Sequence, residues 1–501
     1  MQRQPTSTRS FAAEIDPRGC RPARARPQSP RPNRTELLVR LAIAALLASA
    51  LLAGCTPEEP AQRITNYREL GELRVATRHD AISFRADGES ASGFEHDLIL
   101  LLGERLDVPV SFVVYPDVPR MLAAVMNGEV HMAAAGLARN ERLPLKWSAA
   151  LRDVDYVLVG RDDTPALRAE SDFSGRMVSA RRGSLVLEKV ERLRKREPGL
   201  NLHVPVTEGD QTLLEHVAEG RLDLVATDRL HFALAKRIFP DLQVAWDLPL
   251  KSEIAWALPL DEHDPLAAEV DAFLRESTGS GLLARVADRY FGHVQRLRDQ
   301  DINAFLQRTR ELLPRYRRHF QEAQARTGID WRMLAALAYQ ESQWDPLATS
   351  RTGVRGMMML TAETADRLRV QDRLDARESI LGGARYLAML RDELPDEIHE
   401  PDRLWMATAA YNLGMGHLRG ARAIARSMER DNTSWWGMKS VLPLLSRPEY
   451  ASRLKAGAAR GGEAVIMTER IRNYYDILSR IEPPYVPPLQ PRNIVLGRAA
   501  D

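Results

Sequence analysis

The sequence predicts a multidomain protein in which a two-lobed α/β domain precedes a mainly α-helical domain. Its 501 residues are too many for one ordinary domain and favour two or three. Short apolar runs alternate with amphipathic helical stretches from Tyr67 to about residue 291, and helical periodicity alone continues from there. Hydrophobic content of 44% and charged content of 28% are typical of globular domains, which excludes a wholly disordered or an integral membrane class.

We expect five segments along the chain. They are a leader (1–54), a short polar tether (55–66), the first domain (67–296), the second domain (297–482) and a proline-rich tail (483–501). The α/β pattern ends near Gly292 to Arg298, which sets the boundary between the domains. Five prolines between Glu482 and Pro491 predict an extended tail.

The leader has the pattern of a signal peptide. An apolar run from Leu37 to Ala53 follows basic residues and is broken by Arg40, so its uninterrupted part is too short to span a bilayer comfortably. The leader holds nine Arg against three acidic residues, and the rest of the chain therefore carries a formal charge of −4. This balance gives no indication of nucleic-acid binding.

A cysteine, Cys55, directly follows the leader. The segment Leu52-Ala53-Gly54-Cys55 resembles the lipobox of bacterial lipoproteins, which implies cleavage before Cys55 and its lipidation. Several acyl chains anchor a protein stably to a membrane. Thr56 follows the cysteine, which in that class implies the periplasmic face of the outer membrane. The alternative is a simple secretory signal with an incidental cysteine, and in either case Cys20 lies in the leader, so no disulfide is expected.

The first domain begins with a strand over 73–77, a helix over 94–106 and a strand over 110–115. An internal repeat follows, because residues 121–134 match residues 213–226 in their apolar positions. Each copy is a helix that a glycine ends, Gly128 or Gly220, before a strand. Two similar units predict two lobes with a cleft between them.

The segment Gly93-Phe94-Glu95-His96-Asp97-Leu98 and the two-lobed pattern resemble the family 3 periplasmic solute-binding proteins. This resemblance implies a periplasmic-binding-protein-like domain without catalytic activity and with a regulatory role, in which Phe84 packs on a ligand, Arg142 binds its carboxylate and Asp228 faces its amine. In that family, threonines usually precede the arginine that binds the ligand. The segment from Gly136 to Arg139 lacks them. We therefore expect a cell-wall peptide in place of a free amino acid. The alternative is a cleft whose charges bind nothing.

The run Arg78-His79-Asp80 invites interpretation as a metal site or a catalytic triad. We reject both, because no further His or Cys falls at ligand spacing and the nearby serines lack the glycines of a nucleophile elbow. The remaining glycines mark isolated turns and no phosphate-binding loop. The sequence thus predicts neither a metal nor a cofactor.

In the second domain, one glutamate stands on an apolar helix face. Asp330 is a good N-cap and Pro346 biases the residue before it out of the helical region, so we expect a helix between them. Glu341 lies three, four and seven residues beyond the apolar residues Ala338, Leu337 and Leu334. Burial and the negative end of the helix dipole should both raise the pKa of Glu341, as a general acid requires. The alternative is a solvated or Arg-paired glutamate.

Three segments support the catalytic interpretation: Glu341-Ser342, residues 350–360 (SRTGVRGMMML) and residues 409–414 (AAYNLG). Together they resemble the signature segments of the soluble-lytic-transglycosylase family, whose fold is a goose-lysozyme-like helical domain, over roughly Ile329 to Tyr475. At position 359 this chain has Met where most of that family has Gln. The methionine triplet after a solute-binding-like domain is typical of one membrane-bound group within the family.

This second resemblance implies roles for individual residues. Glu341 would be the catalytic acid and Tyr411 would orient it or the substrate. Ser350 and Asn412 would hydrogen-bond the sugars, and Met358 would pack against a sugar face. The substrate would be the glycan strands of peptidoglycan.

Hydrolases that cleave glycosidic bonds generally use two carboxylates, and here only one candidate is convincing. The other, Glu463, follows Gly461-Gly462 in the first turn of a helix, where an ionised acid is stabilised by the dipole. The resemblance implies a lyase that cleaves the MurNAc–GlcNAc bond without water and leaves 1,6-anhydroMurNAc ends, in cell wall turnover. Two alternatives remain: a tethered peptide or amino-acid sensor with an inactive lysozyme-like domain, and a muramidase that uses water.

Other helices of the second domain are expected over 301–327, with a break at Pro314, and over 380–390, 404–412 and 463–480.

Overall fold

The structure of the chain is a computed structural model. It describes residues 64–486, apart from residues 65, 88–89, 166, 262–264, 295–296 and 456. The leader, the predicted lipidation site Cys55 and the end of the tail lie outside the described residues. Within the described part, the helices are too short or too polar for any of them to cross a lipid bilayer.

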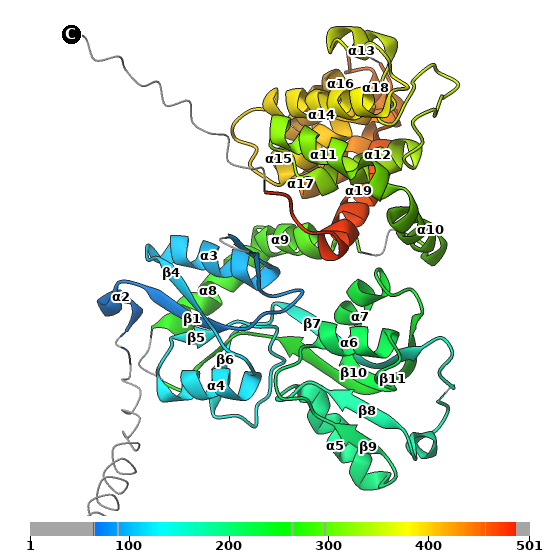
Figure 1. Cartoon of the computed structure of the whole chain (residues 1–501). Helices are drawn as coiled ribbons and strands as arrows, with labels where there is room; N and C mark the ends of the chain where they lie inside the picture. Colours follow the sequence, from blue (N-terminus) through cyan, green and yellow to red (C-terminus); the bar gives the residue numbers. More distant parts are fainter. Residues whose placement is uncertain are drawn as a thin grey trace, which may run out of the picture. The chain divides into compact units, whose positions relative to one another are not determined.

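The first lobe of the α/β domain is built on a five-stranded sheet. Its strand order is β4-β1-β5-β12-β6, with β1 parallel to β4 and β5 and with β12 antiparallel to β5 and β6. The strands are β1 (Leu73–Thr77), β4 (Val110–Val114), β5 (Met132–Ala133), β6 (Leu145–Trp147) and β12 (Ala257–Pro259), beside a small hairpin of β2 (Arg85–Asp87) and β3 (Ser90–Ser92). The helices are α2 (Tyr67–Leu70), α3 (Phe94–Leu106), α4 (Val118–Asn127), α8 (Leu266–Gly279) and α9 (Leu282–Phe291) (Figure 1).

The second lobe has a five-stranded sheet of its own, in the order β11-β7-β10-β8-β9. Strand β10 is parallel to β8 and antiparallel to β7. The strands are β7 (Arg152–Arg161), β8 (Met177–Ala180), β9 (Asn201–His203), β10 (Leu224–Asp228) and β11 (Leu242–Ile254). The helices are η1 (Glu170–Phe173), α5 (Leu185–Arg196), α6 (Asp210–Ala218) and α7 (Arg229–Lys236) (Figure 1).

The internal repeat corresponds to one helix and the strand after it in each lobe. Helix α4 leads into β5 of the first sheet and α6 leads into β10 of the second, and Gly128 and Gly220 follow the two helices with φ of +73° and +74°. The chain passes between the lobes twice, and these two segments bond to each other through Leu151 N–H to the Ile254 carbonyl at 2.8 Å. A paired crossover of this kind is a natural hinge.

The rest of the described chain is helical (Figure 1). Its buried apolar side chains form a single core. Near the predicted break, α10 (Asp299–Glu311) ends before Leu312, and α11 (Leu313–Thr327) begins after it with Pro314 as its second residue. The helices are α10 (Asp299–Glu311), α11 (Leu313–Thr327), α12 (Trp331–Ser342), α13 (Ala362–Arg367), α14 (Ala376–Asp392), α15 (Asp402–Leu413), α16 (Met415–Ser427), α17 (Trp435–Val441), η2 (Leu442–Ser446), α18 (Pro448–Ala451) and α19 (Gly461–Ile481). The predicted fold class, a two-lobed α/β domain followed by a mainly helical one, is confirmed.

Candidate active site

Helix α12 is part of the helical core and carries Glu341 near its C-terminal end. Asp330 caps the helix, accepting from the Arg332 amide at 2.8 Å. Leu334 and Leu337 on the face of Glu341 are fully buried. The helix packs against α11, α14 and α19, so its position is fixed on several sides.

The end of α12 differs from the prediction. We expected a helix of about four turns that ends before Asp345, but it already ends at Ser342, since Gln343 and Trp344 take left-handed conformations with φ of +55° and +62°. Trp344 is 1% exposed, and its indole N–H donates to the Ala335 carbonyl at 2.9 Å. Burial of this large side chain against the preceding turns ends the helix early. Glu341 therefore lies in the last turn.

The carboxyl group of Glu341 is partly exposed yet largely surrounded by protein. Burial raises its pKa from 4.5 to about 7. No charged side chain of the described residues contributes to this shift, so neither a cation nor a second carboxylate acts on Glu341 at close range. The group is therefore a carboxylic acid with a pKa near neutral pH and no charged partner among the described residues.

The segment Met357–Met358 lies between α12 and α15 and is bonded to both. The Ser342 hydroxyl donates to the Met357 carbonyl at 2.8 Å, and the Tyr411 hydroxyl donates to the Met358 carbonyl at 2.8 Å. Burial, and after it the charge of Glu341, holds the pKa of Tyr411 well above its ordinary value. Tyr411 is therefore close enough to Glu341 to sense its charge, and the structure brings the two together.

Met358 does not lie where the sequence analysis put it. Its side chain is fully buried, so it cannot pack against a sugar face in this structure. Its amide donates to the Ser379 hydroxyl at 3.1 Å, and a Cβ added to Gly383 would lie 2.6 Å from the Met358 Cβ. Because Gly383 on α14 has no side chain, there is space beside it for the Met358 side chain. The partly exposed neighbour Met359, with φ of +46°, is nearer the surface.

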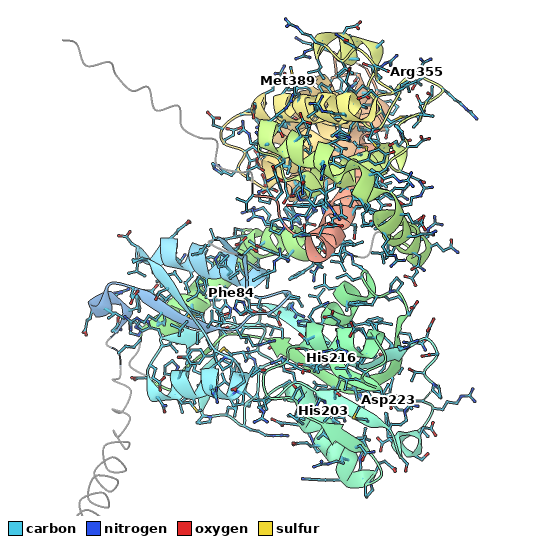
Figure 2. All side chains as sticks on the ribbon, viewed as in Figure 1. Phe84, His203, His216, Asp223, Arg355 and Met389 are labelled. Carbon is cyan, nitrogen blue, oxygen red and sulfur yellow. The ribbon has the colours of Figure 1, made fainter. Side chains whose placement is uncertain are left out.

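Ser350 and Asn412 are accessible to a substrate. The Ser350 hydroxyl accepts from the amides of Thr352 and Val354 at 3.2 and 3.3 Å and so shapes the loop that leads to Arg355. Arg355 is labelled in Figure 2. Asn412 is exposed in the last turn of α15. Their contacts with sugars stay predictions.

The sequence analysis missed Tyr386 on α14. Its half-buried ring packs on that of Tyr411 with the centroids 5.2 Å apart. Tyr386 stands three residues after Gly383 and so lies on the same face of α14. That spacing, taken with a Gly-Gly pair inside a strong helix, is the signal that points to this helix face.

In the first lobe, Phe84 belongs to an aromatic cluster. It is 5% exposed and packs on His96 and Phe112 with centroid separations of 5.8 and 5.2 Å (Figure 2). The ring of Phe84 therefore packs mainly against other side chains of the lobe. A ligand would contact only its small exposed part.

Arg142 and Asp228 are not brought together. Arg142 is exposed and donates to Glu188 of the second lobe at 2.5 Å. Asp228 is buried, caps α7 by accepting from the amides of Leu230 and His231, and also lies 2.6 Å from the His231 ring. The predicted pair for the carboxylate and amine of one ligand is thus not formed, since each residue already has a partner in the protein.

Comparison with known families agrees with this organisation. The family model "Bacterial extracellular solute-binding proteins, family 3" matches residues 73–293, and "Transglycosylase SLT domain" matches residues 318–434, a range that includes Glu341 and Tyr411. An ancestral arginine-binding protein bound to arginine has a TM-score of 0.41 and 19% identity, over 44% of this chain and 98% of that chain. The two family models place the chain in the class in which a solute-binding-like domain precedes a transglycosylase domain.

Full-length relatives are more specific. Membrane-bound lytic murein transglycosylase F of Thiobacillus denitrificans is 43% identical over 91% of this chain and 96% of the relative. The protein of the same name from Methylobacillus flagellatus is 40% identical over 90% and 96%. The chain belongs to the membrane-bound lytic murein transglycosylase F family, and the resemblance drawn from its sequence is confirmed.

Proposed function

We propose that this protein is a peptidoglycan lytic transglycosylase and that Glu341 is its only acid and base. Membership of the lytic murein transglycosylase F family supports the reaction. The buried environment of Glu341 supports its role as acid and base. A general acid must hold its proton near the working pH, and burial gives Glu341 a pKa of about 7. This buried carboxyl group, which has a raised pKa and no charged partner among the described residues, is the observation that carries the proposal.

The reaction has two steps. Glu341 first donates its proton to the glycosidic oxygen between muramic acid and glucosamine as the bond from C1 breaks, while the N-acetyl group of the muramic acid stabilises C1. The resulting carboxylate then takes the proton of the C6 hydroxyl, whose oxygen bonds to C1. The product has a 1,6-anhydro end, the carboxyl group regains its proton and no water is consumed.

Within the part of the chain that the structure describes, no second acid is seen to act on Glu341, and this favours the route without water over hydrolysis. Enzymes that hydrolyse glycosides generally place a second carboxylate about 5–10 Å from the acid. Among the described residues, no other acid shifts the pKa of Glu341. Glu463, the rival in the sequence, is exposed and pairs with Arg460 at 3.4 Å in the first turn of α19.

The test is mass analysis of the ends released from purified sacculi. We expect disaccharide-peptides lighter than hydrolytic products by one water, as 1,6-anhydro ends require. Reducing ends would contradict the proposal and identify a muramidase. Release of no product at all would favour the inactive sensor.

The relatives are named as membrane-bound proteins, and this supports a location at a membrane for this chain. Lipidation of Cys55 would attach the protein to the periplasmic face of the outer membrane. The solute-binding-like domain would bind a cell-wall peptide and regulate the catalytic domain, which requires that the peptide bind two states with different affinities.

A further inference from the structure

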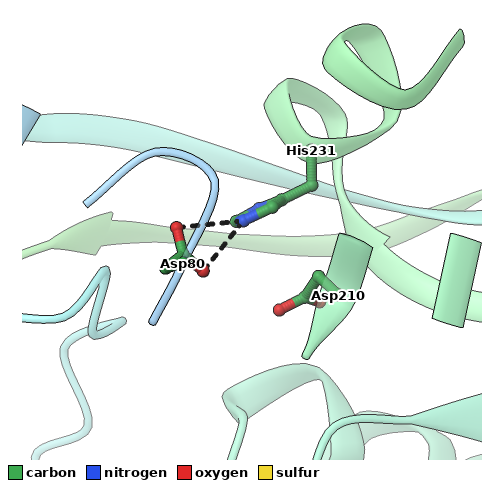
Figure 3. A group of neighbouring side chains, drawn as sticks. All are labelled: Asp80, Asp210 and His231. Atoms are coloured by element: carbon green, nitrogen blue, oxygen red, sulfur yellow. Dashed lines mark hydrogen bonds and ion pairs between the residues drawn. The ribbon is translucent and has the colours of Figure 1, made fainter. Parts of the chain in front are cut away.

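A charged group in the first domain is compact enough to hold a metal ion. It consists of Asp80, Asp210 and His231 (Figure 3). Arg78 lies 2.6 Å from Asp80 and Arg181 lies 2.6 Å from Asp210, so each carboxylate already has a guanidinium partner. A divalent cation would have to bind beside these two guanidinium groups, whose charges repel it. This group therefore does not suit a metal ion.

A second cluster lies beside Glu341 and consists of apolar side chains. Tyr411 on α15 and Tyr386 on α14 pack ring against ring, with 5.2 Å between the centroids and 58° between the planes. Both rings are partly buried against the helical core. Met389, three residues after Tyr386 and so on the same face of α14, is partly buried in the same way (Figure 2). Tyr411, Tyr386 and Met389 thus form a partly exposed strip that starts beside the catalytic acid.

The two tyrosine hydroxyls differ in their hydrogen bonds. The Tyr411 hydroxyl donates to the Met358 carbonyl at 2.8 Å, so its hydrogen is already engaged. Among the described residues, the Tyr386 hydroxyl has no hydrogen-bond partner. A phenolic hydroxyl can both donate and accept. Tyr386 therefore offers a free polar group at the edge of an apolar ring, and a sugar has matching hydroxyls around an apolar C–H face.

The charges that act on the two hydroxyls show which of them is nearer to the catalytic acid. Burial, and after it the charge of Glu341, raises the pKa of Tyr411. Burial raises the pKa of Tyr386 as well, and the charges that act on it come from Arg367 and Glu363 of α13 and from the end of α14. Tyr386 thus lies beyond Tyr411, toward α13. Because a sugar ring is about as wide as an aromatic ring, the step from Tyr411 to Tyr386 corresponds to about one sugar.

The strip is held in place by the packing of α14. This helix contacts α11, α12 and α15, and Leu387 and Leu390 on its inner side are buried. One turn before Tyr386, Gly383 makes room for Met358, whose carbonyl accepts the Tyr411 hydrogen bond. A binding surface that is already ordered loses little conformational entropy when a ligand binds. The strip is therefore a preformed surface for a glycan strand.

We propose that Tyr386 binds the sugar next to the pair that shares the cleaved bond, with its ring against the face of that sugar and its hydroxyl in a hydrogen bond to it. Met389 extends the contact along α14. The inference rests on the proposed transglycosylase activity and adds a binding position to it. A glycan strand that reaches along α14 binds more tightly than a fragment that ends at the cleaved bond.

Binding of soluble glycans to the full chain tests the proposal in the absence of cleavage. Every variant also carries Glu341→Gln, and NMR titration measures the Kd of peptide-free GlcNAc–MurNAc fragments of two and of six sugars. Tyr386→Leu removes an aromatic anchor, so the Kd of the six-sugar fragment should rise about 10-fold. Tyr386→Phe removes only the hydroxyl, and about a threefold rise is expected. The Kd of the two-sugar fragment should change less than about twofold in both variants.

Tyr450 on α18 provides the matched control. Its ring is also partly buried, and the Arg453 guanidinium lies over it at 5.6 Å from the centroid. Tyr450→Leu and Tyr450→Phe make the same chemical changes on a helix that packs on η2. The Kd of both fragments should stay within about twofold, and thermal unfolding shows that each variant is folded.

An unchanged Kd of the six-sugar fragment in Tyr386→Leu would overturn the proposal, as would an equal rise for both fragments. Tyr386→Phe, which keeps the packed ring, gives the same decision if Tyr386→Leu does not fold. Lyase activity is measured separately, from the ends that the chain with Glu341 releases from sacculi. Failure of the proposed reaction and failure of the Tyr386 contact are therefore seen in different experiments.

Discussion

Replacement of Glu341 by Gln should lower the rate of murein cleavage by about 10³-fold or more. Gln has nearly the same shape but can neither donate the proton to the leaving oxygen nor accept one from the C6 hydroxyl. General acid–base groups contribute about 10²–10⁴-fold, and here one group serves both steps. The measurement is the initial rate of soluble muropeptide release from purified sacculi.

Glu463→Gln is the control for this variant. It makes the same chemical change in an exposed residue that pairs only with Arg460, and exposed pairs contribute little. We expect its rate to stay within about twofold of the wild type. If both variants retained the native rate, Glu341 would not be the acid, and if both lost it, the loss would not be specific to Glu341.

Replacement of Gly383 by Ala should damage the wall of the site without touching its chemistry. The added Cβ would lie 2.6 Å from the Met358 Cβ, and Met358 is fully buried. Overpacking of this kind costs about 1–3 kcal/mol of stability. Displacement of the Met357–Met358 segment by about 1 Å should also lower the cleavage rate by up to about 100-fold.

The control is Gly416→Ala, at the start of α16. A Cβ there would meet no atom within 4 Å, so the variant should be neutral or slightly stabilised. Thermal unfolding and muropeptide release are measured for both variants. Wild-type stability and rate in Gly383→Ala would contradict the tight contact with Met358.

Much of the architecture was predictable from local patterns. The helix over 94–106 has the predicted bounds, and the repeat of helix, glycine and strand correctly indicated two lobes. These features depend on apolar spacing and on glycines with positive φ, both of which are local in the sequence. The position of Glu341 on a buried helix face followed from the same periodicity.

The features that could not be predicted depend on distant partners. Met358 is buried because Gly383, twenty-five residues later, leaves space for it. The run Arg78-His79-Asp80 looked like a metal site without further ligands, and the partner of Asp80 is His231, 151 residues away. No pattern in the sequence joins these pairs, since side-chain packing decides them after the fold has formed.

Direct titration of Glu341 tests the central claim, that an unpaired and largely buried carboxyl group holds its proton near neutral pH. NMR of the protein labelled with ¹³C at glutamate carboxyls, with the Glu341 signal assigned from its loss in Glu341→Gln, measures that pKa. The account predicts a midpoint at about pH 7, and the cleavage rate should fall as pH rises through the same value because the acid form is lost. A midpoint near the ordinary glutamate value of about 4.3 would contradict it.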